Sequence, residues 1–469
     1  MRYLIYSCCY AAPHFETELE LASKAMQDGH EVFFVICDAD LKTCFINPNH
    51  KMSICYACQS KVKNGLNMLA VPNRNVFRLS QFDVGNISFE YPFSSMSELK
   101  KYRYKDSDIG YAVASSLVTI FRDHQLDTVK YGKEVNRGLT TAIIVHEKGE
   151  QILQTIKPNV VIMFNGRFLE YRPMMRLCEK RGIDFYTHER GGKMDRYMLR
   201  KNSTPHSIAF VKTEIDELWG NGGEEKIITG RKFFLDRRNK VVQSWSVYTK
   251  DQEIGSLPEG FDKTKKNIAF FNSSMDEYEG IPDFSNPLYE DDNIGIASIC
   301  QSFLDNENYH FYLRVHPNLK GLDNAQNRAI NNLATRFNNL TIIQAADSID
   351  TYALMEAVDL VITFGSTMGV EALYWNKPAL LLGKAFYEGL EGIIQPKDHE
   401  EVVYYINNTP VAASNASAVK YGYWCISFGT KFNHFEADGL LSGKFMGKRI
   451  KPSVVSKIRS RINLLFEGN

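Results

Sequence analysis

The feature that most constrains this fold is a recurring order of short apolar strands and amphipathic helices. Residues 3–9 form a short apolar run, residues 19–27 place apolar side chains at helical spacing, and residues 31–36 form a second apolar run. Gly29 stands between the last two segments, as a typical C-terminal stop of a helix. Strand, helix and strand in this order, with strands that are apolar throughout, predict a parallel sheet that helices cover on both faces.

The same order returns later in the chain. A strand is expected at 160–164, a helix at 169–181 and another strand at 183–186. A second series of strands starts near residue 265, with expected bounds of 267–271, 311–315, 341–343, 360–363 and 379–382. A chain of 469 residues needs two or three domains. We therefore predict an α/β protein with two Rossmann-like, doubly wound parallel-sheet domains.

A polar stretch at 245–265 is the best candidate for a linker between the domains. It predicts an N-terminal domain over 1–245, a C-terminal domain over 246–420, and a helical segment over 421–469 that packs back on the first domain. The last part, 453–466, has apolar residues at a period of 3.6 with basic residues between them. Docking on an anionic inner membrane is a second interpretation of this basic helix.

The charge balance excludes one class of partner. Lys and Arg total 55, as do Asp and Glu, so the formal net charge is zero. Such a chain has no overall attraction to nucleic acid, and we expect no nucleic-acid partner. The sequence has no apolar run long enough to span a bilayer, and its N-terminus lacks the long apolar core of a signal peptide. The expected location is therefore cytoplasmic.

Two motifs of the second half stand where predicted strands end. Arg314 and His316 lie at the end of the strand at 311–315, and the run that begins at Gly365 passes from the strand at 360–363 into a helix. Ligands of open α/β sheets bind at the carboxyl ends of strands. A turn of small residues that opens a helix presents backbone N–H groups to phosphate. The two motifs therefore predict a phosphate site, with Arg314 and His316 as its cations.

Hydroxyl and carboxylate side chains accompany these motifs. Ser366 and Thr367 add hydroxyl donors, and Glu371 lies one turn into the helix, where it could accept hydrogen bonds from a ribose. Ser273 and Ser274 follow the first strand of this half and are further candidates for contact with a nucleotide donor. The alternative is that these hydroxyls only cap helices.

Three segments of the second half carry a resemblance to a known family. They are RVHPN (314–318), ITFGSTMGVEALYWNKPALLLG (362–383) and FYEG (386–389). These segments resemble the bacterial capsule-polysaccharide biosynthesis glycosyltransferases, which have the GT-B fold of two Rossmann-like domains facing a cleft. The resemblance is good over about 305–390 and weaker in the N-terminal half.

The resemblance implies a function and a donor site. His316 with Pro317, together with Ser366 and Thr367, would hold the donor phosphate, and Glu371 would contact the nucleoside. The enzyme would move a sugar, without a catalytic metal, from a nucleotide donor to a capsule or O-antigen glycan. A CMP-sugar such as CMP-Kdo is the favoured donor and a UDP-sugar the next. The acceptor would be an oligosaccharide or a lipid-linked glycan.

The N-terminal half should supply the base that deprotonates the acceptor hydroxyl. His14 follows the first strand, with Glu16 close by, and several GT-B enzymes place their base in this loop. His188 and Glu189 end a later strand and form a second candidate location. The choice between the two locations stays open, and each set could also be solvated or capping residues.

Four cysteines cluster in the first half, namely Cys37, Cys44, Cys55 and Cys58. Four thiolates suit a tetrahedral zinc ion, and they predict a small metal-binding insertion at 37–58 with a structural role. An iron–sulfur cluster is the competing interpretation, and disulfides or free thiols remain a third. The other cysteines are interpreted as ordinary buried thiols: Cys8, Cys9, Cys178, Cys300 and Cys425.

Three alternatives differ from this interpretation. Asp38 and Asp40 imitate the metal-binding Asp-x-Asp of the GT-A glycosyltransferases, although they come too early in the chain for that fold. A nucleotide-sugar 2-epimerase of the same fold would need no acceptor. A non-catalytic scaffold of a polysaccharide assembly complex, stabilised by its metal, would bind no nucleotide.

Overall fold

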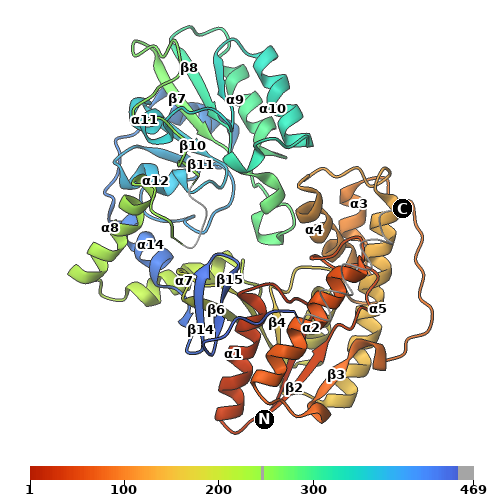
Figure 1. The fold of residues 1–469 in the computed structure, drawn as a ribbon. Helices are drawn as coiled ribbons and strands as arrows, with labels where there is room; N and C mark the ends of the chain where they lie inside the picture. The colour runs from red at the N-terminus through yellow and green to blue at the C-terminus, as the bar shows by residue number, and fades with distance from the viewer. Residues whose placement is uncertain (244–247, 453–469) are drawn as a thin grey trace. The chain divides into compact units, whose positions relative to one another are not determined.

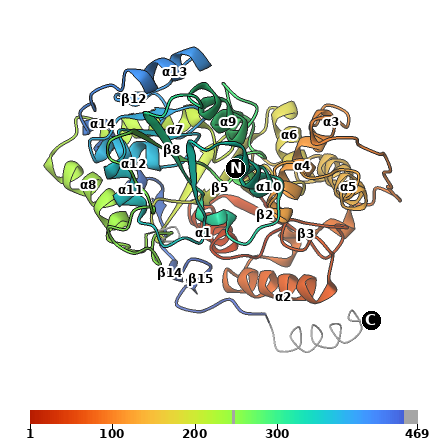
Figure 2. The ribbon, with the colours of Figure 1, turned by 90° about the horizontal axis from the view of Figure 1, so that it is seen from above.

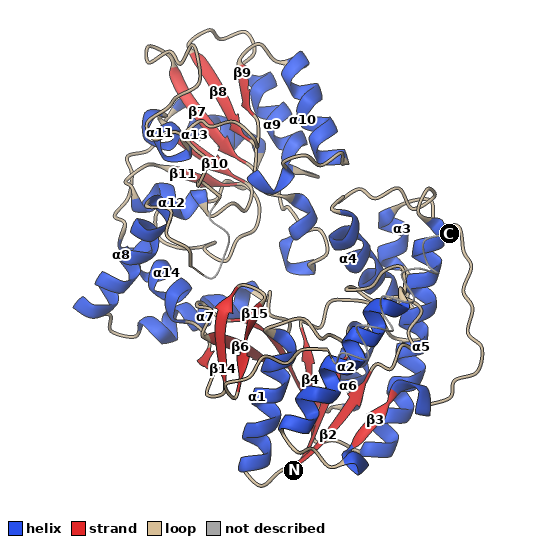
Figure 3. Ribbon diagram, viewed as in Figure 1, coloured by secondary structure: helices blue, strands red, loops and turns tan. Residues whose placement is uncertain are grey.

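The chain forms two compact α/β units in the computed structural model, which describes residues 1–243 and 248–452 (Figure 1). The first unit is built from three stretches of the described chain: 1–121, 125–205 and 429–452. The second unit is built from the short stretch 122–124 and, within its described part, from 206–428. Figure 3 shows a sheet in each unit with helices packed around it, and the prediction of an α/β fold is confirmed.

A seven-stranded sheet is the centre of the first unit, in the order β13-β6-β5-β4-β1-β2-β3. Its strands are β1 (Arg2–Ser7), β2 (Glu31–Ile36), β3 (Val76–Arg78), β4 (Val160–Phe164), β5 (Asp184–Arg190), β6 (Arg196–Lys201) and β13 (Thr430–Lys431). The strands from β5 to β3 pair in parallel, whereas β6 and β13 pair in antiparallel fashion at one edge. β4 is buried at every residue, as expected of a parallel strand covered on both faces.

Helices cover both faces of this sheet. On the faces lie α1 (His14–Gln27), α2 (Met52–Met68), α5 (Gly132–Ile156) and α6 (Arg172–Arg181). Two further helices, α3 (Met96–Lys101) and α4 (Ile109–Phe121), form a separate core with α5. Leu4 and Tyr6 of β1 belong to a core shared with α5 and α6, whereas Ile5 between them belongs to a core shared with α1 and α2. Figure 2 accordingly shows α2 and α5 on opposite sides of β2 and β3.

The chain returns to the first unit after residue 428. β13 pairs with β6, and a hairpin of β14 (Phe435–Gly439) and β15 (Ser442–Phe445) follows. Glu20 of α1 accepts hydrogen bonds from the backbone N–H groups of Asn433 and His434, at 2.7 and 2.9 Å. Strands therefore make this return in the described part, where a helical segment was expected.

The second unit has a parallel sheet in the order β12-β11-β10-β7-β8-β9. Its strands are β7 (Lys266–Phe271), β8 (Tyr309–Arg314), β9 (Leu340–Ile343), β10 (Leu360–Thr363), β11 (Ala379–Leu381) and β12 (Ile393–Ile394). The five strands expected from the sequence are all present, and β12 is an additional edge strand. The central residues of β7, β8 and β10, which lie in the middle of this sheet, are buried on both of its faces.

The helices of the second unit begin before the expected domain boundary. They are α7 (Ile208–Trp219), α8 (Glu224–Arg238), α9 (Asp292–Ser302), α10 (Ala325–Arg336), α11 (Thr351–Ala357), α12 (Met368–Tyr374), α13 (His399–Asn407) and α14 (Ala416–Ser427). α8 and α14 touch through glycines, because a Cβ on Gly230 would lie 2.1 Å from the Val419 carbonyl oxygen. This close packing places residues 206–243 in the second unit, whereas we had expected them in the first.

No helix between residues 1 and 243 or between 248 and 452 is long and apolar enough to cross a bilayer. The predicted helix at 453–466, and with it the proposed membrane contact, lies outside the described residues.

Candidate functional site

Three predicted motifs meet at one edge of the second sheet. β10, β7 and β8 are neighbours, and their carboxyl ends lead into 364–367, 272–274 and 315–318. The chain adds β8 on one side of β7 and β10 on the other, so the topological switch point of the sheet lies between β10 and β7. The side-chain oxygen of Asn272 also accepts a hydrogen bond from the backbone N–H of His316 at 2.8 Å. The motifs therefore form one site at the position where open α/β sheets bind ligands.

Gly365 stands at the switch point itself. A Cβ at this position would lie 2.8 Å from the carbonyl oxygen of Lys384 and 3.2 Å from the hydroxyl of Ser273. That hydroxyl is buried and has no hydrogen-bond partner among the described residues. Ser273 therefore remains a candidate hydrogen-bond donor to a ligand. Gly365 has no side chain, which lets its backbone lie close to Ser273 and to the Lys384 carbonyl.

Gly365→Ala should lower the free energy of unfolding by about 1–3 kcal/mol, because the new methyl group meets a backbone carbonyl that cannot rotate away. Denaturant unfolding of the whole chain measures the effect. Gly132→Ala is the control, since no atom lies within 4 Å of a Cβ there. Equal stabilities of the two variants would contradict the predicted clash.

Ser274 supports the site from inside instead of facing a ligand. It is fully buried, and its hydroxyl donates to Asp276, which also forms an ion pair with Arg122. Arg122 belongs to the second unit and donates a further hydrogen bond to the Asn318 carbonyl at 3.1 Å. We had predicted that Ser274 contacts the nucleotide donor. In the structure Ser274 instead holds Asp276, and Asp276 places the half-exposed guanidinium of Arg122 beside the His-Pro loop.

His316 is uncharged at neutral pH. Burial lowers its pKa to about 4; Asp276 opposes this shift, and the charges of Arg122 and Arg237 add to it. Its Nδ1 accepts a hydrogen bond from the Asn318 N–H at 3.2 Å, so the neutral ring carries its proton on Nε2. His316 is therefore a neutral hydrogen-bond donor, whereas the sequence suggested a cation. The positive charge around it comes from the two arginines.

Arg314 has a structural role. Its guanidinium donates to the carbonyl oxygens of Gln344 and Asp347, at 2.6 and 3.1 Å, and the side chain is buried. Burial lowers its pKa, against the charge of Asp347. Arg314 fixes the loop after β9 through its two terminal nitrogens, and its contact with phosphate stays a prediction.

Glu371 is bound on both oxygens by the protein itself. Arg237 Nε lies 2.9 Å from Oε1, and the Thr367 hydroxyl donates to the same oxygen at 3.0 Å. The Tyr352 hydroxyl donates to Oε2 at 2.6 Å, and the side chain is 0% exposed. Glu371 therefore anchors Arg237 and Thr367. We had predicted that it contacts a nucleoside, but both of its oxygens already have partners within the protein. Arg237 donates to the Thr367 hydroxyl as well, at 3.1 Å.

The Gly-Ser-Thr turn is tightly held. Ser366 Oγ accepts from the Met368 N–H at 3.3 Å, and the Ser366 carbonyl accepts from the Tyr387 hydroxyl at 2.5 Å. Pro317 begins a short 3-10 turn in the neighbouring loop. α12 has seven residues, so it supplies little of the helix dipole on which the sequence argument relied. The positive charge that could bind an anion here comes instead from Arg122 and Arg237.

Sequence reasoning missed both of these arginines. Arg237 lies on α8, which was assigned to the other domain, and Arg122 follows α4 of the first unit. Neither stands in a motif, and a single arginine in a sequence is most often a surface residue. Only the packing of α8 and of residues 122–124 on the second unit reveals them.

The first unit unites the two candidate locations of a base. His14 begins α1 directly after the β1 loop, whereas His188 and Glu189 lie on β5. β1 and β5 flank β4, and His14 Nε2 lies 3.5 Å from Glu189 Oε1. The rings of His14 and His188 are 6.2 Å apart between their centroids. The alternatives left open by the sequence are thus one cluster.

Both histidines of this cluster are neutral. Burial lowers the pKa of His14 to about 3, and Arg190 and Lys61 add to the shift. Burial also lowers the pKa of His188 to about 3. The neighbouring His14 adds to this shift, and the charge of Glu189 opposes it. A neutral imidazole can accept a proton, so the cluster is in the form that a general base needs.

Glu18, which lies beneath this cluster, is a buried acid. Its Oε1 is 3.6 Å from His188 Nε2, and both side chains are 0% exposed. Burial raises the pKa of Glu18 well above its usual value, against a short hydrogen bond from Ser7. The pair is therefore a contact of a buried carboxyl, whose pKa is raised, with a neutral imidazole, and it supports β5 from within.

Glu16 is not available as a base. It forms an ion pair with Lys61 at 2.7 Å, and both side chains are at most 10% exposed. His14 and Glu189 remain, with side chains 11% and 18% exposed. Asn165 holds Glu189 in place by donating to its Oε2 at 2.9 Å. The candidate catalytic pair is therefore His14 with Glu189.

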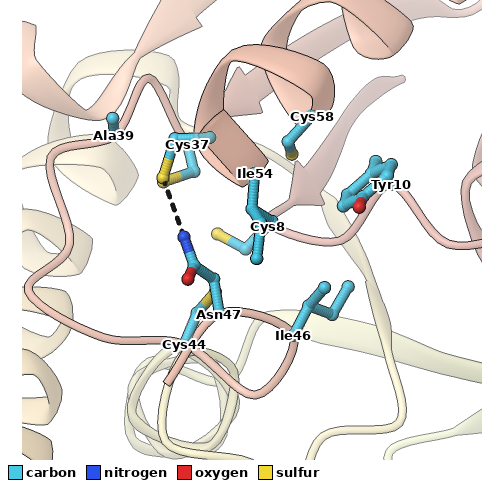
Figure 4. Close-up of a pocket in the computed structure, with 10 residues that line it drawn as sticks. Cys8, Tyr10, Cys37, Ala39, Cys44, Ile46, Asn47, Ile54 and Cys58 are labelled. Carbon is cyan, nitrogen blue, oxygen red and sulfur yellow. Dashed lines mark hydrogen bonds between the residues drawn. The ribbon is translucent and has the colours of Figure 1, made fainter. Parts of the chain in front are cut away.

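The four clustered cysteines converge on one small cavity of about 30 Å³ (Figure 4). Cys37 and Cys44 come from the loop after β2, and Cys55 and Cys58 from α2. Cys8, interpreted from sequence as an ordinary buried thiol, lines the same cavity. All of these cysteines are free thiols.

The segment 37–58 is not an insertion. It is a loop followed by the first turns of α2, and α2 is the crossover helix between the parallel strands β2 and β3. Cys55 and Cys58 therefore stand on a helix of the fold itself, whereas we had expected a small insertion. As the side chains stand, no group of three His, Cys, Asp or Glu residues in 1–243 and 248–452 is arranged for a metal ion.

Burial keeps the thiols of Cys37, Cys44 and Cys58 protonated. It raises the pKa of Cys37 to about 11, against hydrogen bonds from the backbone at Leu41, Ala39 and Asp40. It also raises the pKa of Cys44 and of Cys58 well above the usual value.

Asp38 and Asp40 do not form a metal site of the GT-A kind. Asp40 forms an ion pair with Lys148 at 2.7 Å, whereas Asp38 accepts hydrogen bonds from Ser80. The two carboxylates therefore have different partners.

The second unit matches a known family. Residues 246–404 match the family model described as capsule polysaccharide biosynthesis protein. The match includes all three loops at the edge of β10, β7 and β8, and it confirms the resemblance inferred from the motifs. No curated protein matches the chain.

Several solved structures are similar to the chain. One is Thermosulfurimonas dismutans KpsC, a beta Kdo 2,4 transferase, with 14% identity, a TM-score of 0.35, and coverage of 64% of this chain and 85% of that one. A beta Kdo 2,7 transferase of the same KpsC has 12% identity, a TM-score of 0.36, and coverage of 69% and 90%. Methanocaldococcus jannaschii UDP-GlcNAc 2-epimerase has 11% identity, a TM-score of 0.26, and coverage of 90% and 98%.

Proposed function

We propose that this chain is a glycosyltransferase of capsule or surface-polysaccharide synthesis, with GT-B architecture, whose second unit binds a nucleotide-sugar donor. The family match over 246–404 supports this proposal, because it spans the three loops at the carboxyl ends of β10, β7 and β8. The observation that carries it is the neutral donor His316 beside two guanidinium groups, at the carboxyl edge of a parallel sheet.

Transfer places negative charge on the leaving nucleoside phosphate. Arg122 and Arg237 would compensate that charge, since Asp276 and Glu371 hold both guanidiniums beside the loops. The Nε2–H of His316 and the unpartnered hydroxyl of Ser273 would donate hydrogen bonds to phosphate oxygens. Fixed donors of this kind stabilise developing charge without reorganisation, as a divalent ion does in other transferases.

The first unit would activate the acceptor, an oligosaccharide or lipid-linked glycan. The neutral imidazole of His14 takes the proton of the attacking hydroxyl. The Glu189 carboxylate, 3.5 Å away, stabilises the imidazolium that forms. This assignment gives each unit one half of the reaction.

The favoured donor is a CMP-sugar such as CMP-Kdo, with a UDP-sugar next. The His-Pro motif at 316–317 and the Ser-Thr pair at 366–367 support this order, because they resemble the phosphate-binding motifs of CMP-sugar enzymes. Calorimetric titration of the chain with CMP, CDP, UDP, GDP and ADP tests it. Binding of none of these nucleotides would refute the proposal, and turnover of a UDP-sugar without an acceptor would replace it by epimerase activity.

His316→Gln should weaken binding of the preferred nucleotide roughly 10- to 100-fold, the value of a hydrogen bond to a charged group. The matched control is His310→Gln at the other end of β8, where the ring contacts the Thr341 hydroxyl at 2.8 Å. Calorimetry on both variants measures the effect. An unchanged dissociation constant for His316→Gln would remove His316 from the donor site.

A further inference from the structure

The cysteine cavity of the first unit is not used by the proposed reaction. Five of the nine cysteines line it, although they come from the β1 loop, the β2 loop and α2. Packing alone gives no reason for this gathering, because any small apolar side chain would fill the space. A volume of about 30 Å³ is far too small for a sugar or a nucleotide, whereas it is of the size that a single ion needs.

The backbone around the cavity is arranged as thiolates require. Cys55 and Cys58 are one turn apart on α2, so they share a face of the helix. The Asn47 amide donates to Cys55 Sγ at 3.2 Å, while its oxygen holds the Lys51 N–H at the start of α2. Figure 4 shows Asn47 and the thiols turned toward the same space.

Further donors face the other sulfurs. Backbone groups at 39, 40 and 41 form hydrogen bonds to the Cys37 sulfur, and those at 46 and 47 to the Cys44 sulfur. Hydrogen bonds of this kind orient ligands and offset the charge of sulfur around bound metals.

We propose that Cys37, Cys44, Cys55 and Cys58 bind one Zn²⁺ as a tetrahedral set of thiolates. Four thiols lose their protons to solvent as four Zn–S bonds form. Binding requires the cysteine side chains to rotate about their Cα–Cβ bonds from the positions in which the structure shows them. With four protein ligands the site has no open position, so its role is structural. The ion ties the loop at 37–51 to α2, next to Cys8 and Tyr10 of the loop that leads to His14.

Metal titration of the reduced, chelator-treated full chain tests this site without any assay of activity. Co²⁺ should bind at one equivalent and give the visible absorption of a tetrahedral thiolate complex, and one equivalent of Zn²⁺ should bleach it. Zinc should also remain with the chain after desalting, at one ion per chain by elemental analysis.

Variants assign the ligands. Cys55→Ser combined with Cys58→Ser should abolish uptake, whereas Cys178→Ala, a buried thiol on α6, and Cys8→Ala should keep it. Absence of uptake by the unmodified chain, which needs no variant to fold, would overturn the proposal. Uptake retained by the double variant would do the same, as would iron with acid-labile sulfide in place of zinc.

Discussion

His14→Gln should lower the rate of sugar transfer by roughly 10²- to 10⁴-fold, the usual contribution of a general base. Donor affinity should stay unchanged, because the donor loops belong to the second unit and His14 to the first. The imidazole is neutral and stands 3.5 Å from Glu189, so the variant removes the proton acceptor and leaves its partner carboxylate in place. Single-turnover kinetics with saturating donor and acceptor measure the effect.

The pH profile distinguishes this base from an ordinary histidine. Burial lowers the pKa of His14 to about 3, so the ring loses its proton-accepting form only near that pH. The transfer rate should therefore show no decline centred at about 6.5, the usual pKa of histidine. His30→Gln, beyond the other end of α1, is the control and should keep the full rate. A full rate for His14→Gln would assign the role of base elsewhere.

Arg237→Met should lower the free energy of unfolding by about 3–5 kcal/mol, the usual cost of breaking a buried ion pair from one side. Glu371 is 0% exposed and would lose its charged partner while keeping its burial. Burial by itself would lower the pKa of Arg237, but the charge of Glu371 raises it above the usual value, so the two groups depend on each other. Denaturant unfolding of the whole chain measures the loss.

A double-mutant cycle separates this pair from simple packing. Arg237→Met combined with Glu371→Gln should recover part of the stability, because no charge is then left buried. Arg238→Met is the matched control on the same helix, since Arg238 pairs with a half-exposed Glu356 and should cost at most about 1 kcal/mol. Equal costs for Arg237→Met and Arg238→Met would contradict the assigned role of Glu371.

Local patterns were enough to predict the elements of both sheets. The runs at 267–271 and 360–363 are apolar throughout because each strand is buried on both faces, and this burial leaves a signature in a few consecutive residues. Apolar runs of the same kind predicted where His316 and the Ser-Thr pair lie, because each motif follows such a strand. Parallel strands bring their carboxyl ends to one edge, so residues that follow neighbouring strands meet there without further information.

The state of the site residues could not be predicted in this way. The sequence identified His316 and Glu371 but not their surroundings. Burial keeps His316 neutral, and Glu371 is already bound by Arg237. Arg122 and Arg237 reach the site from segments far away in the chain, through contacts that no local spacing encodes. The domain boundary was placed too late for the same reason, since glycine contacts between α8 and α14 determine it.

The sequence by itself determined the α/β architecture, the motif-bearing loops and the cluster of cysteines, because each depends on the order of residues within a short segment. Only the tertiary structure decided that His14 and Glu189 form one pair, that Cys8 joins the other four thiols, and that two arginines flank His316. Charge state, burial and partnership depend on which distant segments pack together. That packing is a property of the whole fold and leaves no periodic signal in the sequence.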